Sequence, residues 1–102
     1  MSRTLGFVTA MILRAVRDGH RHGADIMAAT REGGGTVYKV LRRLEERGLI
    51  QGRWEEAAIA EAERRPRRRY YRLTRAGDAE LVRALDRYRE LAVGPLGEEA
   101  FE

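Results

Sequence analysis

The residues of this chain that could do chemistry lie in two basic segments. The first carries hydroxyl and cationic side chains at spacings that include three and four residues: Thr36, Tyr38, Lys39, Arg42 and Arg43. Side chains three or four residues apart lie on one side of an α-helix. Arginine binds phosphate, and it also donates paired hydrogen bonds to the edge of guanine. The segment therefore predicts a helical surface for a polyanion.

The second basic segment is RRPRRRYYRLTR at 64–75, which contains seven arginines and no acidic residue. The last nine residues, GPLGEEAFE, contain three acids and no base. Such segregation of charge is typical of proteins with a nucleic-acid partner. Five of the arginines are expected to approach DNA: Arg64, Arg65, Arg67, Arg68 and Arg69. A solvated segment neutralised by the glutamates at 55–63 is the alternative.

The basic face at 36–43 also has a simpler interpretation, as a solvated surface with local ion pairs. Arg42 and Glu46 are spaced for attraction, whereas Lys39 and Arg43 repel each other. Local pairing therefore does not account for the basic half. Glu45 and Glu46 follow near the end of the segment, away from the expected contact with DNA.

Catalysis and metal binding find little support. The two histidines, His20 and His22, share one turn, and no cysteine is present to act as nucleophile or thiolate ligand. Glu55 and Glu56 are adjacent, so on a strand they face opposite sides and form no general acid/base pair. We expect no enzyme activity, no cofactor and no metal.

The whole chain has 102 residues, of which 43% are hydrophobic, and a formal net charge of +4. This length predicts one small domain. Neither a signal peptide nor an apolar run long enough for a membrane span is visible, so we expect a cytoplasmic protein without membrane contact.

Apolar periodicity predicts four helices. The first covers 3–18 and is apolar on more than one side, and the second covers 23–30. The third covers 36–47, where Val37, Val40, Leu41 and Leu44 form the buried stripe. Thr36 or Gly35 would cap its start, the glycines at 33–35 would allow positive φ angles, and Gly48 would end it. The fourth covers 75–92 and begins after the capping residue Thr74.

Two segments, 49–55 and 68–73, resemble strands, with Tyr71 and Leu73 expected to face inward. The residues between them show no period and predict a hairpin loop. The resulting order predicts a mainly α fold with a small β-hairpin (α+β). This fold is a winged helix-turn-helix at 1–74, followed by a dimerisation helix at 75–93 and a loosely ordered acidic tail at 94–102. Segment 36–47 would enter the major groove, and the arginines at 64–69 would follow the backbone or the minor groove.

The first and last helices carry more apolar surface than one small domain covers, which predicts a homodimer. The expected interface residues are Leu5, Val8, Ile12, Leu81, Leu85, Tyr88 and Leu91. A buried central helix within a monomer is the alternative. Trp54 has two open interpretations, as a core residue under the hairpin or as an aromatic platform in a ligand pocket.

Several stretches together resemble the PadR family of bacterial winged helix regulators: HGADIM at 22–27, GTVYKVLRRLEERGLI at 35–50, Trp54, and RRRYYRLTRAG at 67–77. The resemblance implies a homodimeric transcription factor, usually a repressor, whose dimer is built by the N-terminal and C-terminal helices. It implies DNA contacts from Thr36, Tyr38, Lys39 and Arg42. It also implies a response to small aromatic or amphipathic effectors. Ala24, Glu32 and Lys39 depart from the common family pattern.

Two other classes of partner remain as alternatives. A winged helix that binds proteins without specific DNA binding would present an apolar third helix, whereas this one is basic. RNA binding would call for exposed aromatic residues on which bases stack, and Tyr70 is the one obvious candidate.

Overall fold

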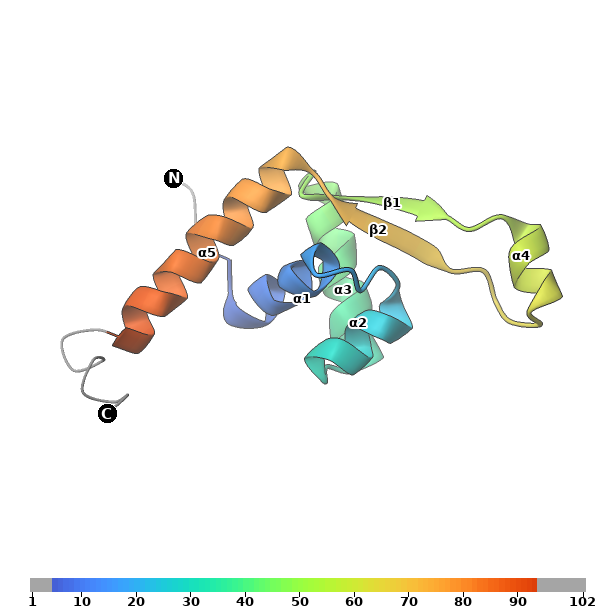
Figure 1. Ribbon diagram of the computed structural model, residues 1–102, viewed down its shortest axis with the longest axis horizontal. Helices are drawn as coiled ribbons and strands as arrows, with labels where there is room; N and C mark the ends of the chain where they lie inside the picture. Colours follow the sequence, from blue (N-terminus) through green and yellow to red (C-terminus); the bar gives the residue numbers. More distant parts are fainter. Residues whose placement is uncertain (1–4, 94–102) are drawn as a thin grey trace.

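The computed structural model describes residues 5–93, with the backbone alone for residues 90–93. The helices are α1 (Phe7–Arg17), α2 (Gly23–Thr30), α3 (Gly34–Glu46), α4 (Ala57–Ala62) and α5 (Arg75–Val93). The strands β1 (Ile50–Trp54) and β2 (Arg69–Leu73) form one antiparallel hairpin. The predicted tail at 94–102 and the side chain of Leu91 lie outside the described residues. The predicted winged helix fold is confirmed (Figure 1).

The core lies where α1, α2, α3 and α5 meet the base of the hairpin. The predicted stripe of α3, formed by Val37, Val40, Leu41 and Leu44, is buried against it. From β2, Tyr71 is buried and Leu73 packs against the core, as their strand position predicts. We call β1, α4, β2 and the residues that join them (50–73) the wing, and Figure 1 shows it reaching away from the other helices. No helix within residues 5–93 has the length and apolar character needed to cross a membrane.

The start of α3 lies earlier than predicted. Gly33 is the N-cap residue, and its carbonyl accepts hydrogen bonds from the backbone N–H groups of Thr36 (3.1 Å) and Val37 (2.9 Å). Capping by Thr36 or Gly35 is therefore wrong, because both lie inside the first turn. The positive φ angles expected at 33–35 are also absent, whereas Gly48, past the end of the helix, has φ 74° as predicted.

The residues predicted as a plain loop contain α4, at the far end of the wing (Figure 1). Its sequence, AAIAEA, is rich in alanine, which has the highest helix propensity. A six-residue helix is too short to stand alone, and buried Ala60 anchors this one to the rest of the wing.

The predicted cap of α5 is confirmed. The Thr74 hydroxyl accepts a hydrogen bond from the Gly77 N–H (3.0 Å) and donates one to the Gly48 carbonyl (2.7 Å). A side chain at Gly77 would overlap the Leu49 carbonyl, so α5 lies directly against the residues that lead into β1. These contacts fix the angle at which α5 leaves the wing.

Part of the predicted dimer interface belongs to the core of the subunit. Leu5, Ile12 and Leu81 are buried within their own chain, because α5 lies along α1. Their assignment to a subunit interface is therefore wrong. Tyr88 is partly buried, and its hydroxyl donates to the Leu5 carbonyl (2.7 Å). A fully apolar pattern indicates burial, but it does not say which chain supplies the cover.

Replacing Leu81 with alanine is expected to lower the free energy of unfolding by about 2–5 kcal/mol, because the side chain is fully buried. Urea unfolding followed by circular dichroism measures this loss. The loss should be the same at low and high protein concentration. A strong dependence on concentration would instead place Leu81 between subunits, and Arg87→Ala, which changes an exposed polar residue of the same helix, is the control.

Candidate nucleic-acid interface

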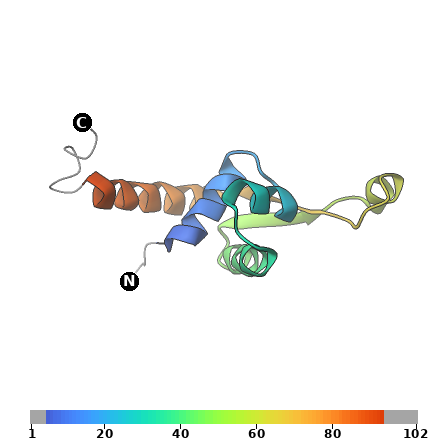
Figure 2. The same ribbon diagram turned by 90° about the horizontal axis from the view of Figure 1, so that it is seen from below.

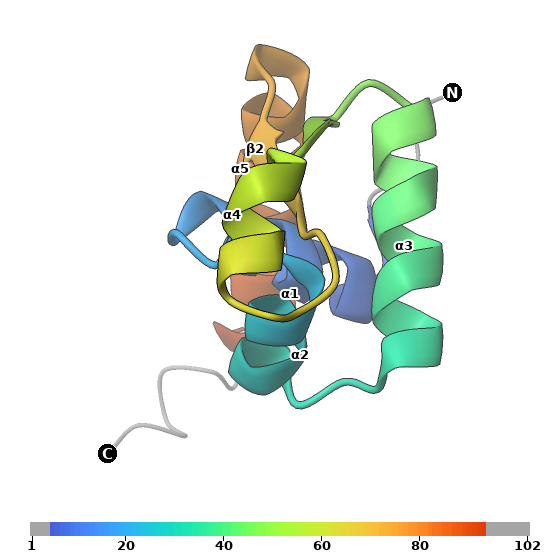
Figure 3. The same cartoon turned by 90° about the vertical axis from the view of Figure 1, so that its right-hand side faces the viewer.

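The outer face of α3 is open to solvent along its length. All five residues predicted on it are exposed: Thr36, Tyr38, Lys39, Arg42 and Arg43. Figure 3 shows α3 at one edge of the molecule, with the other helices on its opposite side. Figure 2 shows α3 end-on, standing out from the layer formed by the other helices. A helix placed in this way can enter a groove without obstruction from the rest of the fold.

The cations of this face are not neutralised within the chain. Among the ion pairs formed within the described part of the chain, none involves Lys39, Arg42 or Arg43, and the Arg42–Glu46 pair that the spacing allows does not form. An exposed set of cations without carboxylate partners attracts polyanions. The ion pairs of the local-pairing alternative therefore do not form within residues 5–93, and a solvated basic face remains the alternative to DNA binding.

Tyr38 combines exposure with a fixed position. Its side chain is 51% exposed, yet the ring packs directly on Gly23, where any side chain would overlap the phenol. The glycine of the HGADIM stretch thus lets α2 hold a tyrosine of α3 in place. The phenol therefore lies against the first residue of α2 while half of the tyrosine remains exposed.

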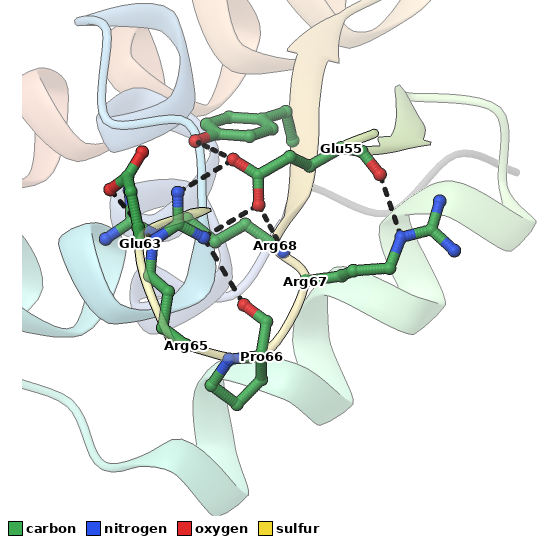
Figure 4. A network of polar contacts seen from close by, with 7 residues as sticks. Glu55, Glu63, Arg65, Pro66, Arg67 and Arg68 are labelled. Atoms are coloured by element: carbon green, nitrogen blue, oxygen red, sulfur yellow. Dashed lines mark hydrogen bonds and ion pairs between the residues drawn. The ribbon is translucent and has the colours of Figure 1, made fainter. Parts of the chain in front are cut away.

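A buried carboxylate organises the tip of the wing (Figure 4). The Glu55 side chain is 4% exposed and accepts two hydrogen bonds from the Arg65 guanidinium, at 2.7 and 2.8 Å. It also accepts the backbone N–H of Arg68 (3.2 Å). Arg65 makes a second ion pair with Glu63 (3.2 Å). We therefore correct the assignment of Arg65, since its guanidinium serves the wing and is not open to DNA.

Electrostatics strengthens this contact. Hydrogen bonds from Arg65 lower the pKa of Glu55 from its usual 4.5 to about 2, against the effect of burial, and the Arg68 N–H adds to the lowering. The pKa of Arg65 is raised by the same hydrogen bonds. Both groups stay charged across the physiological range of pH.

The order of the wing tip should depend on pH in one direction. Because the pKa of Glu55 is lower in the folded wing than in an unfolded one, the wing gains stability above pH 4.5 and loses it as the pH falls toward 2. The carboxyl ¹³C shift of Glu55, followed by NMR, should titrate with a midpoint at about 2. A midpoint near 4.5, the ordinary value for glutamate, would contradict the Glu55–Arg65 contact.

The guanidinium groups of Arg69 and Arg67 both lie close to an exposed tryptophan. Trp54 is 55% exposed, so the interpretation as a core residue is wrong. The guanidinium of Arg69 lies 5.4 Å and that of Arg67 5.9 Å from its ring centroid, within the range of cation–π contacts. Trp54 is the last residue of β1, beyond the part of the hairpin that the core covers.

The wing arginines fall into two groups. Arg69 pairs with Glu45 of α3, just as Arg65 pairs with Glu55. Arg64 and Arg67 are exposed and Arg68 is partly exposed; within residues 5–93 none of the three has an ion pair. Arg67 is anchored through its Nε, which donates to the Glu55 carbonyl (2.9 Å), so its terminal nitrogens project from a fixed base.

The ion pairs that two glutamates form with these arginines were not predicted from the sequence. Glu45 contacts Arg69 across 24 positions of sequence, and Glu55 contacts Arg65 across ten. Charge composition alone did not reveal which acid meets which base. The register of the hairpin is the signal that could have indicated the contacts of Glu55. It pairs Trp54 with Arg69, and this places the next residue, Glu55, opposite Arg68 and close to Arg65.

An apolar surface remains on α1 and α5. Phe7 (58% exposed), Val8 and Val82 (46% exposed) lie on it. The rings of Phe7 and Tyr88 meet edge to face with centroids 5.4 Å apart, which ties the two helices together. Leu85 is partly buried beside them. Of the predicted interface residues, Val8, Leu85 and Tyr88 thus reach the surface of the subunit.

Known proteins share this arrangement. The family model of the transcriptional regulator PadR-like family matches residues 12–83. A PadR-like transcription factor from Bacteroides fragilis is 26% identical, with a TM-score of 0.70 and 84% of each chain covered. BpsR of Bordetella bronchiseptica, whose DNA binding is regulated by 6-hydroxynicotinic acid, is 25% identical, with a TM-score of 0.68, 96% of this chain and 74% of that chain covered.

Bacillus subtilis PadR, solved in complex with operator DNA, has the same fold, with a TM-score of 0.65 and 24% identity. The match covers 78% of this chain and 48% of that one. No curated protein sequence matches the chain. The family and the solved relatives are transcriptional regulators rather than enzymes. With the family model matched from the middle of α1 into α5, this chain belongs to the PadR-like family of transcriptional regulators.

Proposed function

We propose that the chain is a cytoplasmic, homodimeric repressor that binds a specific DNA sequence, with α3 in the major groove. The observation that carries this proposal is the unpaired basic face of α3. Lys39, Arg42 and Arg43 are exposed on one helix, and the ion pairs of residues 5–93 leave all three free. In a helix-turn-helix this second helix reads base edges.

The residues of α3 divide between two kinds of DNA contact. Arg42 lies in the middle of the exposed face, where a guanidinium can pair with O6 and N7 of guanine. Thr36 and Tyr38 lie near the helix start, where hydroxyl groups and free N–H groups suit a phosphate. Arg42 would therefore contribute to sequence preference and the hydroxyl groups to orientation.

The wing would add contacts with the backbone or the minor groove. Arg64, Arg67 and Arg68 are the arginines without a carboxylate partner within residues 5–93, so they carry this part of the proposal. The tip helix α4 is flanked by Glu56 and Glu63, which phosphates repel. The basic strand side of the wing would face DNA, and α4 would point away from it.

A dimer built through the apolar surface of α1 and α5 explains why Phe7, Val8 and Val82 are exposed. A twofold axis there would present two copies of α3 to DNA. Dimers of this kind bind half-sites about 34–36 Å apart, which is one turn of the double helix. We therefore expect a palindromic operator.

We extend the proposal to an effector, a small aromatic or amphipathic molecule, because a relative responds to 6-hydroxynicotinic acid. Its place would be between the subunits, where exposed apolar side chains such as Phe7 can line a pocket. Trp54 is a poor candidate for that pocket. It ends β1 at the outer part of the wing, whereas α5 extends from the base of the hairpin in the opposite direction (Figure 1).

Fluorescence anisotropy with two duplexes tests the proposal. One duplex carries the region upstream of the protein's own gene, since such regulators often control themselves, and the other a random sequence of equal length. We expect tight binding to the first with a clear preference over the second at several salt concentrations. Equal and steeply salt-dependent binding to both would contradict sequence specificity at this site.

A further inference from the structure

We propose that Glu45 is a positioning residue that ties the wing to α3 through Arg69, and that this tie determines how well the protein selects its operator. The inference rests on the proposed function and concerns a residue that does not face the groove. Glu45 lies in the last turn of α3, on the side that faces the hairpin. It is distinct from the basic face formed by Lys39, Arg42 and Arg43.

The Glu45 carboxylate contacts both strands of the wing. Arg69 of β2 donates to it from Nη2 (2.5 Å) and more weakly from Nε (3.4 Å). The backbone N–H of Gly52 in β1 donates to Oε2 (3.3 Å). Within residues 5–93, these are the hydrogen bonds that join an α3 side chain to either strand. One side chain therefore makes the polar side-chain link between the helix and both strands of the hairpin.

The hairpin is shaped to receive this contact. A side chain at Gly52 would overlap the guanidinium of Arg69, so the glycine leaves the space that the arginine fills. The rings of Trp54 and Tyr71 lie 5.4 and 5.9 Å from the same guanidinium. The pKa of Arg69 is raised, chiefly by its hydrogen bond to Glu45. Packing, charge and backbone shape converge on one geometry.

This geometry matters because, besides it, the wing is held to the loop before α2 by the edge-to-face contact of Tyr70 with His22 (ring centroids 5.6 Å apart) and by the Tyr71 N–H, which donates to the Arg21 carbonyl (2.8 Å), and neither contact involves α3. Beyond the core, the wing is a two-stranded hairpin, and isolated two-stranded hairpins are marginally stable. The ring of Trp54 also contacts Arg67, whose guanidinium lies 5.9 Å from the ring centroid. A shift of Arg69 would thus move Trp54 and, with it, the arginine that the proposed function places on DNA.

Because Arg69 is paired with Glu45, its guanidinium is less available to bind DNA phosphates than the unpaired arginines of the wing. If Arg69 served as an ordinary phosphate ligand, removing its charge would weaken binding to every sequence alike. If Arg69 instead positions the wing, removing its charge should weaken binding to the operator more than binding to random DNA. The two roles therefore predict different results for the same variant.

The test uses Glu45→Gln, Arg69→Gln and the exchanged pair Glu45→Arg with Arg69→Glu, with Glu46→Gln as the matched control. Operator and random duplexes are compared by anisotropy over a salt series. We expect each single variant to reduce the preference for the operator by about tenfold, which is within the range of coupling between contacting residues. The exchanged pair restores the ion pair but neither the Gly52 hydrogen bond nor the cation–π contacts, so it should recover part of the preference, and the salt dependence should stay unchanged.

A second measurement on the free protein separates this inference from the proposed function. The chain has no cysteine, so spin labels at Glu46→Cys and Glu61→Cys report the distance between α3 and the wing tip. Unlabelled protein in excess isolates the distance within one subunit. Glu45→Gln should broaden the distribution of distances, and the exchanged pair should narrow it again.

Two results would overturn the inference. One is a distance distribution that Glu45→Gln leaves unchanged. The other is a loss of about 0.9 in the log–log salt slope for Arg69→Gln without recovery in the exchanged pair, which would make Arg69 a phosphate ligand. Absence of operator preference in the unaltered protein would count against the proposed function, and the distances would still decide the role of Glu45.

Discussion

Replacing Arg42 with alanine is expected to lower affinity for the operator by about 10- to 100-fold, because a paired contact with guanine contributes about 1–3 kcal/mol to discrimination. Binding to random DNA should fall by less than about threefold, since one of many cations is lost. Arg42 is exposed and, within residues 5–93, has no ion pair, so the fold should be unaffected. Anisotropy with both duplexes measures the two effects.

Arg47→Ala is the matched control for this experiment. Arg47 is exposed and caps the C-terminal end of α3, beyond the face that would enter the groove. Its removal should change binding to both duplexes slightly and equally. If Arg42→Ala behaved in the same way, Arg42 would hold phosphate and would not read bases.

Placing a charge on the apolar surface of α1 and α5 is expected to separate the subunits. Val8→Arg and Val82→Arg each introduce a cation at an exposed apolar position of the proposed interface. Each variant should be a monomer by light scattering at micromolar concentration. Operator affinity should fall by about 100-fold or more, because the second half-site no longer benefits from a linked partner.

Ala76→Arg is the control for the dimer experiment. Ala76 is exposed on the same helix, six residues before Val82 and therefore on a different side of it. This variant should remain a dimer with little change in operator affinity. A wild-type protein that is itself a monomer at micromolar concentration would contradict the dimer and leave the exposed Phe7 without explanation.

The inner face of α3 shows what local sequence determines. Val37, Val40, Leu41 and Leu44 recur at the helical period, and all four are buried. The hairpin is nearly as direct, since both strands are short runs in which apolar or aromatic residues, such as Ile50 and Tyr71, stand among polar and charged ones. Where an element has a clear period, the sequence contains enough information to predict which side is covered.

Three predictions were wrong because they depended on contacts between residues that the local sequence pattern does not reveal. The short helix α4 has no period, because its six residues include four alanines and Ala60 is its one buried residue. Leu81 was assigned to another subunit, since an apolar pattern does not identify what covers it. Arg65 was assigned to DNA, because its partner Glu55 is brought to it by the hairpin. Tertiary context decided each of them.

The central claim is that two basic α3 helices of one dimer read a specific DNA sequence. Selection of bound duplexes from a random library, followed by sequencing, tests it directly, because every candidate operator competes in the same pool. We predict enrichment of one palindromic sequence whose half-sites lie about 10 base pairs apart. Arg42→Ala should relax the preference at one position of each half-site. A library that stays random after repeated rounds, despite tight binding, would contradict the claim.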